Sequence, residues 1–169
     1  MKTCIFGGTF DPPHIGHLLI AQTIIESENF ERLIFVPANI SPTKKGKVIS
    51  STKKRLDMLN MALIGNDNFE ISDFEINKGD ISYTIDTVTE FAENRNLEKK
   101  DLYFLMGSDT LREFHKWKDP KKIMNLCNII DPIRPRYISY TQLQNHETHS
   151  NQVCPLLDEK KKAWGRPGG

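Results

Sequence analysis

The chain has 169 residues, of which 38% are hydrophobic and 27% charged, and its net charge is +1. This balance is typical of one globular domain, and it excludes a strongly basic nucleic-acid-binding surface and a strong attraction to anionic membranes. No apolar run approaches the ~20 residues of a membrane span, and the first residues leave no room for a signal peptide. Three distant cysteines, Cys4, Cys127 and Cys154, form no metal or disulfide pattern. We therefore expect a soluble, cytoplasmic protein that binds neither nucleic acid nor membrane.

Apolar runs and helical patterns alternate along the chain. Buried strands are predicted at residues 4–6, 33–36, 102–106 and 128–130, and residues 69–76 show a strand-like alternation whose apolar face switches midway. Helices are predicted at residues 18–26, after an N-cap at Ser51, at residues 84–96, around Leu111, and at residues 120–126. This order predicts an α/β fold, a Rossmann-like parallel sheet with helices on both faces.

Two segments lack such patterns. Residues 39–50 are polar and contain three lysines, which indicates a mobile loop. Residues 139–169 show no periodicity, so we expect a domain over residues 1–138 followed by an atypical segment that is truncated, rebuilt or disordered.

The chemistry concentrates in residues 7–17, Gly-Gly-Thr-Phe-Asp-Pro-Pro-His-Ile-Gly-His, between a predicted strand and a predicted helix. Gly7 and Gly8 let backbone N–H groups approach a ligand closely. His14 and His17 are three residues apart at a helix start, so both can face one ligand, and a helix N-terminus favours anions. The segment predicts a phosphate site. Zinc is disfavoured because no third ligand has suitable spacing.

This segment resembles the nucleotidyltransferase superfamily, whose mark is a [T/H]xGH element after a glycine-rich strand end. The same four residues, His14 to His17, also spell the class I aminoacyl-tRNA synthetase signature, but those enzymes are much longer. Three further segments are similar to bacterial nicotinate-nucleotide adenylyltransferases: residues 35–44, with Thr43 where the family usually has His, Ser82-Tyr83-Thr84, and Gly107-Ser108-Asp109 followed by Trp117.

The resemblance implies a role for each matching residue. His14, His17 and Lys44 would act on the ATP phosphates and form the catalytic set. The ATP-binding set would be Gly7, Gly8, Thr9, Phe10, Gly107, Asp109 and Arg134, with Asp109 on the ribose. The nicotinate-binding set would be Ser82, Tyr83, Thr84 and Trp117, with the backbone from Thr84 meeting the carboxylate and Trp117 stacking on the pyridine ring.

The implied reaction is direct adenylyl transfer from ATP, with Mg²⁺, to nicotinate mononucleotide, giving deamido-NAD and pyrophosphate. No residue is assigned as a metal ligand, and a homo-oligomer is left open. If either histidine acts as a cation, activity should fall at high pH.

Some residues have a simpler interpretation. Trp117 could be core packing, although Lys116 and Lys118 beside it suggest the surface. Asp109 could be only a helix cap. Lys45 and Lys47 are interpreted as a solvated loop.

The C-terminal part departs from the family pattern. The family's final Ile-Ser-Ser-Thr-x-x-Arg helix start is missing after Tyr137, and the same string at residues 49–55 comes too early and is interpreted as coincidence. Arg134 opens a turn in which Arg136 replaces a family glycine. Two alternatives therefore stay open: another enzyme of the superfamily, such as pantetheine-phosphate adenylyltransferase or a cytidylyltransferase, and a nucleotide-binding remnant with weak activity.

Overall fold

The computed structural model describes residues 1–42, 50–132 and 137–138, with the backbone alone described at residues 108, 109, 137 and 138. The expectations for Lys44, for Arg134 and for the segment 139–169 lie outside these residues. The domain boundary after residue 138 therefore stays a prediction.

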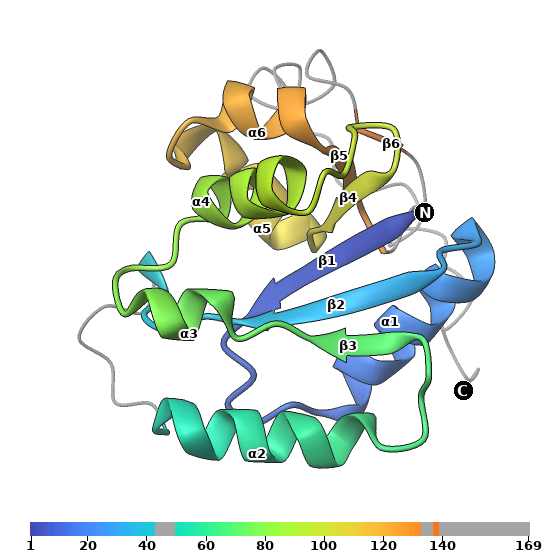
Figure 1. Cartoon of the computed structure of the whole chain (residues 1–169), viewed down its shortest axis with the longest axis vertical. Helices are drawn as coiled ribbons and strands as arrows, with labels where there is room; N and C mark the ends of the chain where they lie inside the picture. Colours follow the sequence, from blue (N-terminus) through green and yellow to red (C-terminus); the bar gives the residue numbers. More distant parts are fainter. Residues whose placement is uncertain (43–49, 133–136, 139–169) are drawn as a thin grey trace, which may run out of the picture.

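The described residues form one twisted sheet with the strand order β3-β2-β1-β4-β5-β6 (Figure 1). Its first five strands in chain order are mutually parallel and are β1 (Thr3–Gly8), β2 (Arg32–Pro37), β3 (Phe69–Ile71), β4 (Leu102–Leu105) and β5 (Asn128–Ile130). The predicted Rossmann-like sheet is confirmed. The strand order reverses between β1 and β4, and ligands of such sheets bind at this point, beyond the carboxyl ends of the strands.

Helices cover both faces of the sheet, as predicted. One face carries α1 (Ile15–Glu28) and α2 (Thr52–Leu63), and the other carries α4 (Thr84–Thr89) and α6 (Pro120–Leu126) (Figure 1). The shorter elements are α3 (Phe74–Lys78), α5 (Ser108–Arg112), a π-helical segment (Glu90–Asn94) that continues α4, and a 3₁₀ turn (Phe114–Lys116).

The central strands are apolar at nearly every position because both of their faces are buried. Cys4 and Phe35 point into the core under α1 and α2, whereas Ile5 and Ile34 point into the core under α4 and α6. Alternating side chains of one strand thus fill two separate cores, as is usual in parallel sheets.

Two expectations need correction. Residues 69–76 are not one strand: β3 ends at Ile71, and α3 begins at Phe74 with Asp73 as its N-cap. The switch of apolar face marks this change, because a strand cannot turn both apolar sets toward one core. In addition, residues 128–130 are not the last strand, since β6 (Tyr137–Ile138) pairs antiparallel with β5.

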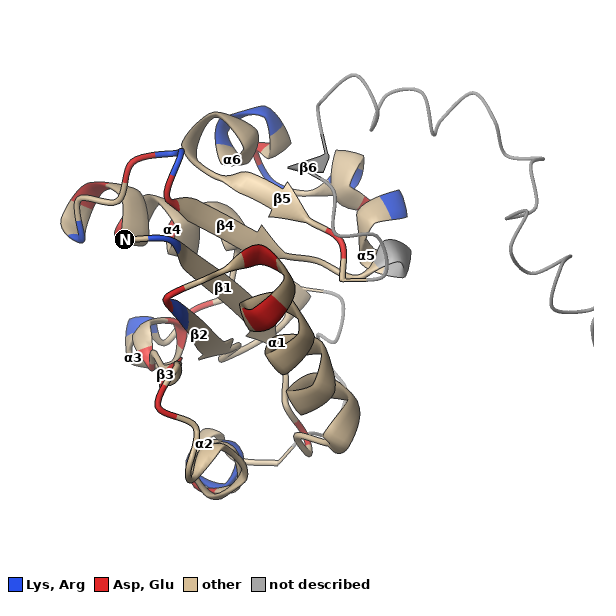
Figure 2. Cartoon of the chain, turned by 90° about the vertical axis from the view of Figure 1, so that its right-hand side faces the viewer, with Lys and Arg blue, Asp and Glu red and all other residues tan. Residues whose placement is uncertain are grey.

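Within the described ranges, no helix is both long and apolar enough to cross a membrane. Charged residues are dispersed over several elements, with acidic residues near the end of α1 and basic ones on α6 (Figure 2). Both signs of charge thus occur on several elements of the described residues.

Candidate active site

The histidine turn lies where β1 passes into α1. Gly7 and Gly8 are the last residues of β1, and His14 is the N-cap of α1, with φ −137° and ψ 167°. His14 is exposed and His17 is half-buried in the first turn of the helix. Both predicted histidines thus stand beyond the carboxyl end of β1, beside the point where the strand order reverses.

A hydrogen bond fixes the orientation of the His17 ring. The backbone N–H of His14 donates to Nδ1 of His17 at 3.2 Å. A ring nitrogen that accepts a hydrogen bond carries no proton, so the proton of the neutral ring is on Nε2. His17 therefore offers an Nε2–H donor, which suits a phosphate oxygen.

The two imidazoles also stack on one another. Their ring centres are 3.7 Å apart and their planes are inclined by 30°. The two imidazole rings therefore lie side by side at the start of α1, where an anion could meet both.

The ring of Phe10 packs against the His17 ring of this pair. Its ring is 2% exposed and meets the His17 ring nearly edge to face, with 5.1 Å between ring centres. Its backbone is left-handed, with φ 49°, which is uncommon for a bulky residue. A non-glycine residue persists in this conformation only where its surroundings hold it, and here the buried ring packs on Phe6 and Phe35.

Gly8→Ala is expected to lower the free energy of unfolding by about 1–3 kcal/mol. A Cβ atom at Gly8 would lie 2.9 Å from the ring of Phe10, which is packed too tightly to move aside. Gly107→Ala is the matched control, since no atom lies within 4 Å of its Cβ position and its φ is −68°. Urea denaturation measures both; equal losses for the two variants would contradict the prediction.

The segment after β2 is joined to the start of α4. The backbone N–H of Asn39 donates to the Ser82 hydroxyl at 2.9 Å, and the N–H of Ser82 donates to the carbonyl of Ile40, also at 2.9 Å. Tyr83 is the N-cap of α4, and Thr84 is its first residue. The Ser82 side chain is buried in this joint, so it is placed to orient the helix start rather than to reach outward.

Glu75 is a buried carboxylate that sequence reasoning missed. It is 8% exposed and accepts a hydrogen bond from the Thr87 hydroxyl of α4. Burial raises the pKa of Glu75, and hydrogen bonds from Thr87 and Ser82 partly oppose this shift. Glu75 thus ties α3 to α4 at the end where the nicotinate site is predicted.

Glu75→Gln is expected to gain stability relative to the wild type as the pH rises from about 4 to about 7. Because the pKa of Glu75 is raised by folding, its ionisation costs the folded state stability as the pH passes through the folded pKa. Glutamine removes this ionisation and still accepts a hydrogen bond from Thr87. Urea denaturation at both pH values measures the free energy of unfolding of Glu75→Gln relative to wild type, with the exposed Glu93→Gln as control. If this difference in free energy is the same at both pH values, the raised pKa of Glu75 is contradicted.

Trp117 is half-buried at the edge of the second core. Its ring meets Phe104 edge to face at 6.4 Å and Phe114 at 5.5 Å between ring centres. The side chain thus packs on the core with one part and stays accessible with another. Both earlier interpretations, packing and ligand stacking, fit this position.

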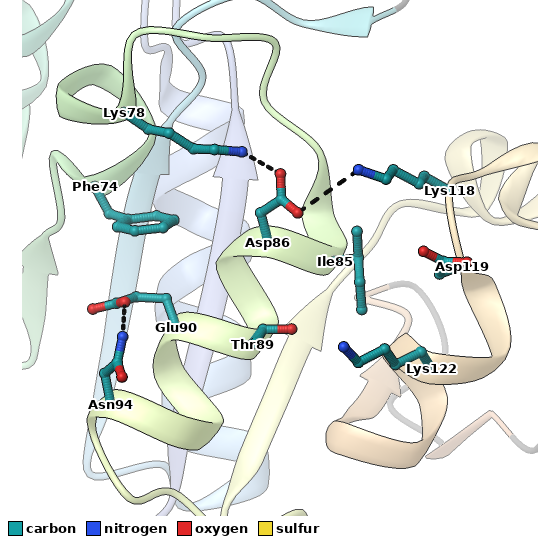
Figure 3. Close-up of a pocket in the computed structure, with 10 residues that line it drawn as sticks. All are labelled: Phe74, Lys78, Ile85, Asp86, Thr89, Glu90, Asn94, Lys118, Asp119 and Lys122. Carbon is teal, nitrogen blue, oxygen red and sulfur yellow. Dashed lines mark hydrogen bonds and ion pairs between the residues drawn. The ribbon is translucent and has the colours of Figure 1, made fainter.

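Lys118 holds the Trp117 segment against α4. Its Nζ lies 4.7 Å from the centre of the Tyr83 ring and 4.0 Å from the Asp86 carboxylate, which also pairs with Lys78 (Figure 3). Lys78, Asp86 and Lys118 line a pocket of about 370 Å³, whose wall carries three lysines and three acidic residues in all. The positive and negative charges of this pocket balance in number, and the contacts of Lys118 join the residue after Trp117 to α4 and its N-cap.

The remaining predicted residues fall at the carboxyl end of β4. Gly107 is exposed and is the N-cap of α5, and Asp109 lies in the first turn of that helix. The backbone therefore brings this segment to the same sheet edge as the histidine turn, across the β1–β4 pair.

The residue that sequence reasoning missed most clearly is Arg55. It is fully buried near the start of α2, and its guanidinium donates to carbonyls of three separate segments. The N-cap predicted at Ser51, by contrast, is confirmed, since its hydroxyl accepts from the N–H of Lys54. Arg55 falls on the same helical stripe as the buried Leu59 and Leu63, and this was the available signal.

The described residues do not fit a resident metal. No group of three or more His, Cys, Asp or Glu side chains among them could hold an ion. Asp11, the carboxylate within residues 7–17, accepts from the Ser50 N–H at 2.7 Å. We assign no protein ligand for a metal here.

Known proteins similar to this chain show its family. The family model described as cytidylyltransferase-like matches residues 5–157, which defines the chain as a nucleotidyltransferase by class. A probable nicotinate-nucleotide adenylyltransferase of Aquifex aeolicus is 43% identical over 126 residues, covering 75% of this chain and 73% of its own. A probable nicotinate-nucleotide adenylyltransferase of Thermoanaerobacter sp. is 39% identical over 98% of this chain and 72% of its own. The chain therefore belongs to the nicotinate-nucleotide adenylyltransferase family.

Solved structures show the same fold at low identity. The Plasmodium falciparum nicotinic acid mononucleotide adenylyltransferase complexed with NaAD matches with a TM-score of 0.66 and 19% identity, covering 86% of this chain and 71% of that one. A putative nicotinate-nucleotide adenylyltransferase from Vibrio parahaemolyticus matches with a TM-score of 0.58 and 20% identity, covering 90% of each chain.

Proposed function

We propose that this chain transfers the adenylyl group of ATP to nicotinate mononucleotide, giving deamido-NAD and pyrophosphate in NAD biosynthesis. The observation that carries the proposal is the 39% identity, over 98% of the chain, to a relative named for this activity. The stacked histidines at the carboxyl edge of the sheet supply a suitable phosphate site.

The transfer needs no covalent enzyme intermediate. A phosphate oxygen of nicotinate mononucleotide attacks the α-phosphorus of ATP, a new P–O bond forms, and the bond to the β-phosphate oxygen breaks to release pyrophosphate. Catalysis then consists of positioning and charge stabilisation. The Nε2–H of His17 donates to a phosphate oxygen, His14 donates beside it, and we propose Lys44 as the cation from the loop after β2.

The acceptor is held at the start of α4. A helix start offers backbone N–H groups and a favourable dipole to a carboxylate, which nicotinate has and nicotinamide lacks. Trp117 offers an aromatic face to the cationic pyridinium ring. Gly107 and Asp109 receive the adenosine of ATP at the end of β4, and Gly8, Thr9 and Phe10 line the nucleotide site.

A divalent cation enters with the ATP phosphates. Transfer from ATP generally uses such an ion, and we propose Mg²⁺ as the ion bound by the triphosphate. We place the reaction in the cytoplasm, where ATP is supplied and free thiols such as the buried Cys4 and Cys127 persist.

A coupled pyrophosphate assay tests the function. The purified chain with ATP and Mg²⁺ should release pyrophosphate when nicotinate mononucleotide is added, and much less with nicotinamide mononucleotide. Release with phosphopantetheine, or with CTP as donor, would contradict the assigned substrates. Binding of ATP without turnover would identify a nucleotide-binding remnant instead.

A further inference from the structure

Arg55 is a fully buried charge whose contacts converge on main-chain oxygens. Nη1 donates to the carbonyls of Thr9 at 2.9 Å and Ala38 at 2.6 Å, Nη2 donates to that of Asn39 at 3.3 Å, and Nε donates to that of Ser50 at 3.2 Å. Four carbonyls from three segments are thus gathered around one planar group. Such a cluster is costly to build for packing alone, since a buried charge needs all of its donors satisfied.

One of these segments is the loop that carries the histidine turn. Thr9 follows the glycine pair of β1 and precedes Phe10, whose ring supports His17. The guanidinium also attracts the Asp11 carboxylate, which in turn accepts from the Ser50 N–H. Arg55 therefore holds the backbone that directly precedes the left-handed Phe10, and it attracts the side chain of the residue that follows.

A second segment leads to the acceptor end of the site. Asn39, whose carbonyl Arg55 binds, donates its N–H to the Ser82 hydroxyl, and Ile40 and Ile81 form a parallel bridge beside that bond. Ser82 directly precedes Tyr83 and Thr84, where α4 begins. The start of α4 thus rests on the same segment that Arg55 holds.

We propose that Arg55 is a positioning residue for both substrates, because one guanidinium fixes the phosphate-facing loop after β1 and the segment after β2 that carries the start of α4. The inference rests on the proposed function for the identity of the substrates. Arg55 touches neither of them and acts through the backbone that it holds.

Arg55→Lys tests this role. Lysine keeps the charge but presents three donors from a single point, which cannot reproduce the planar fork. We expect a folded variant whose kcat falls about tenfold or more and whose KM rises for both ATP and nicotinate mononucleotide, because misplacements near 1 Å at a reacting centre have effects of this size. Rates are taken per folded molecule, as measured by near-ultraviolet circular dichroism.

Arg32→Lys is the matched control. Arg32 is an arginine with polar partners too, since it donates to the Thr3 hydroxyl at 3.0 Å and pairs with Glu70 at 3.5 Å. It is only partly buried, and it begins β2 at the end of the strand opposite to the site. This variant should keep kcat and both KM values within about twofold of wild type, as surface-type changes away from a site usually do.

Several results would overturn the proposal. One is that Arg55→Lys has the same kcat and KM values as Arg32→Lys. Another is that Arg55→Lys changes the KM for only one of the two substrates. If Arg55→Lys does not fold, Arg55→Gln replaces it, and failure of both to fold assigns Arg55 to stability alone. The wild-type assay separates this test from the proposed function. If the wild type shows no turnover with nicotinate mononucleotide, wild type, Arg55→Lys and Arg32→Lys are compared by their dissociation constants for ATP. Calorimetry measures these constants without an acceptor.

Discussion

His17→Ala is expected to lower kcat by about 10²–10³-fold, the usual effect of removing one donor aimed at a transition-state charge. The Nδ1 atom of His17 accepts from the His14 N–H, so Nε2 is the ring nitrogen that we propose faces the phosphate. The fold should survive, because the His17 ring is only half-buried and packs on Phe10 at the edge of the core. A coupled pyrophosphate assay at saturating substrates measures the change, with circular dichroism as the check on folding.

Two further variants separate the two nitrogens of the ring. In His17→Asn the amide oxygen can accept from the His14 N–H, but no donor reaches the Nε2 position, whereas in His17→Gln the longer amide can place a donor near that position. Gln should therefore retain more activity than Asn. Activity within about tenfold of wild type in His17→Ala would remove His17 from the phosphate site.

Trp117→Ala is expected to raise the KM for nicotinate mononucleotide about tenfold, corresponding to a cation–π and stacking loss of about 1–2 kcal/mol. The KM for ATP should change little, because the proposed adenosine site lies at the end of β4 and not at the start of α4. Steady-state kinetics with one substrate varied at a time measures both constants.

Trp117→Phe is the matched variant, since it keeps an aromatic face and the contact with the core. It should fall between wild type and Trp117→Ala in KM. The contrary outcome is an unchanged KM with a lowered melting temperature, which would make Trp117 a packing residue of the core around Phe104 and Phe114.

The buried strands along the chain and the position of the histidine turn could be predicted because they depend on local signals. The buried strands are continuous apolar runs, and β1 and β4 are each closed by glycine. The start of α2 at its Ser51 cap follows from the chemistry of one side chain. The boundary between β3 and α3 could not be predicted, because an alternating pattern of eight residues suits a single strand until the sheet contacts are known. The switch of the apolar face midway was the one sign of it.

The supports of the site could not be predicted in the same way. Arg55 acts on carbonyls as far away as Thr9, and Glu75 acts on hydroxyl groups of α4, so their partners depend on the tertiary fold. A charged residue in a helical stripe of leucines signals that something polar is buried but does not say what it meets. The functional roles of the residues at the site stay predictions that the variants above address.

The hydrogen bonds of Arg55 to main-chain carbonyls affect which amino acids the neighbouring segments can carry. Its four hydrogen bonds end on main-chain oxygens, which every amino acid supplies. Side chains at Thr9, Ala38, Asn39 and Ser50 can therefore be exchanged without losing the contact, provided that the backbone path is kept, whereas no other residue type supplies the guanidinium itself. This contact therefore constrains the amino-acid type at one position, Arg55, whereas Thr9 stays constrained by its proposed place in the nucleotide site and Ala38 by its burial.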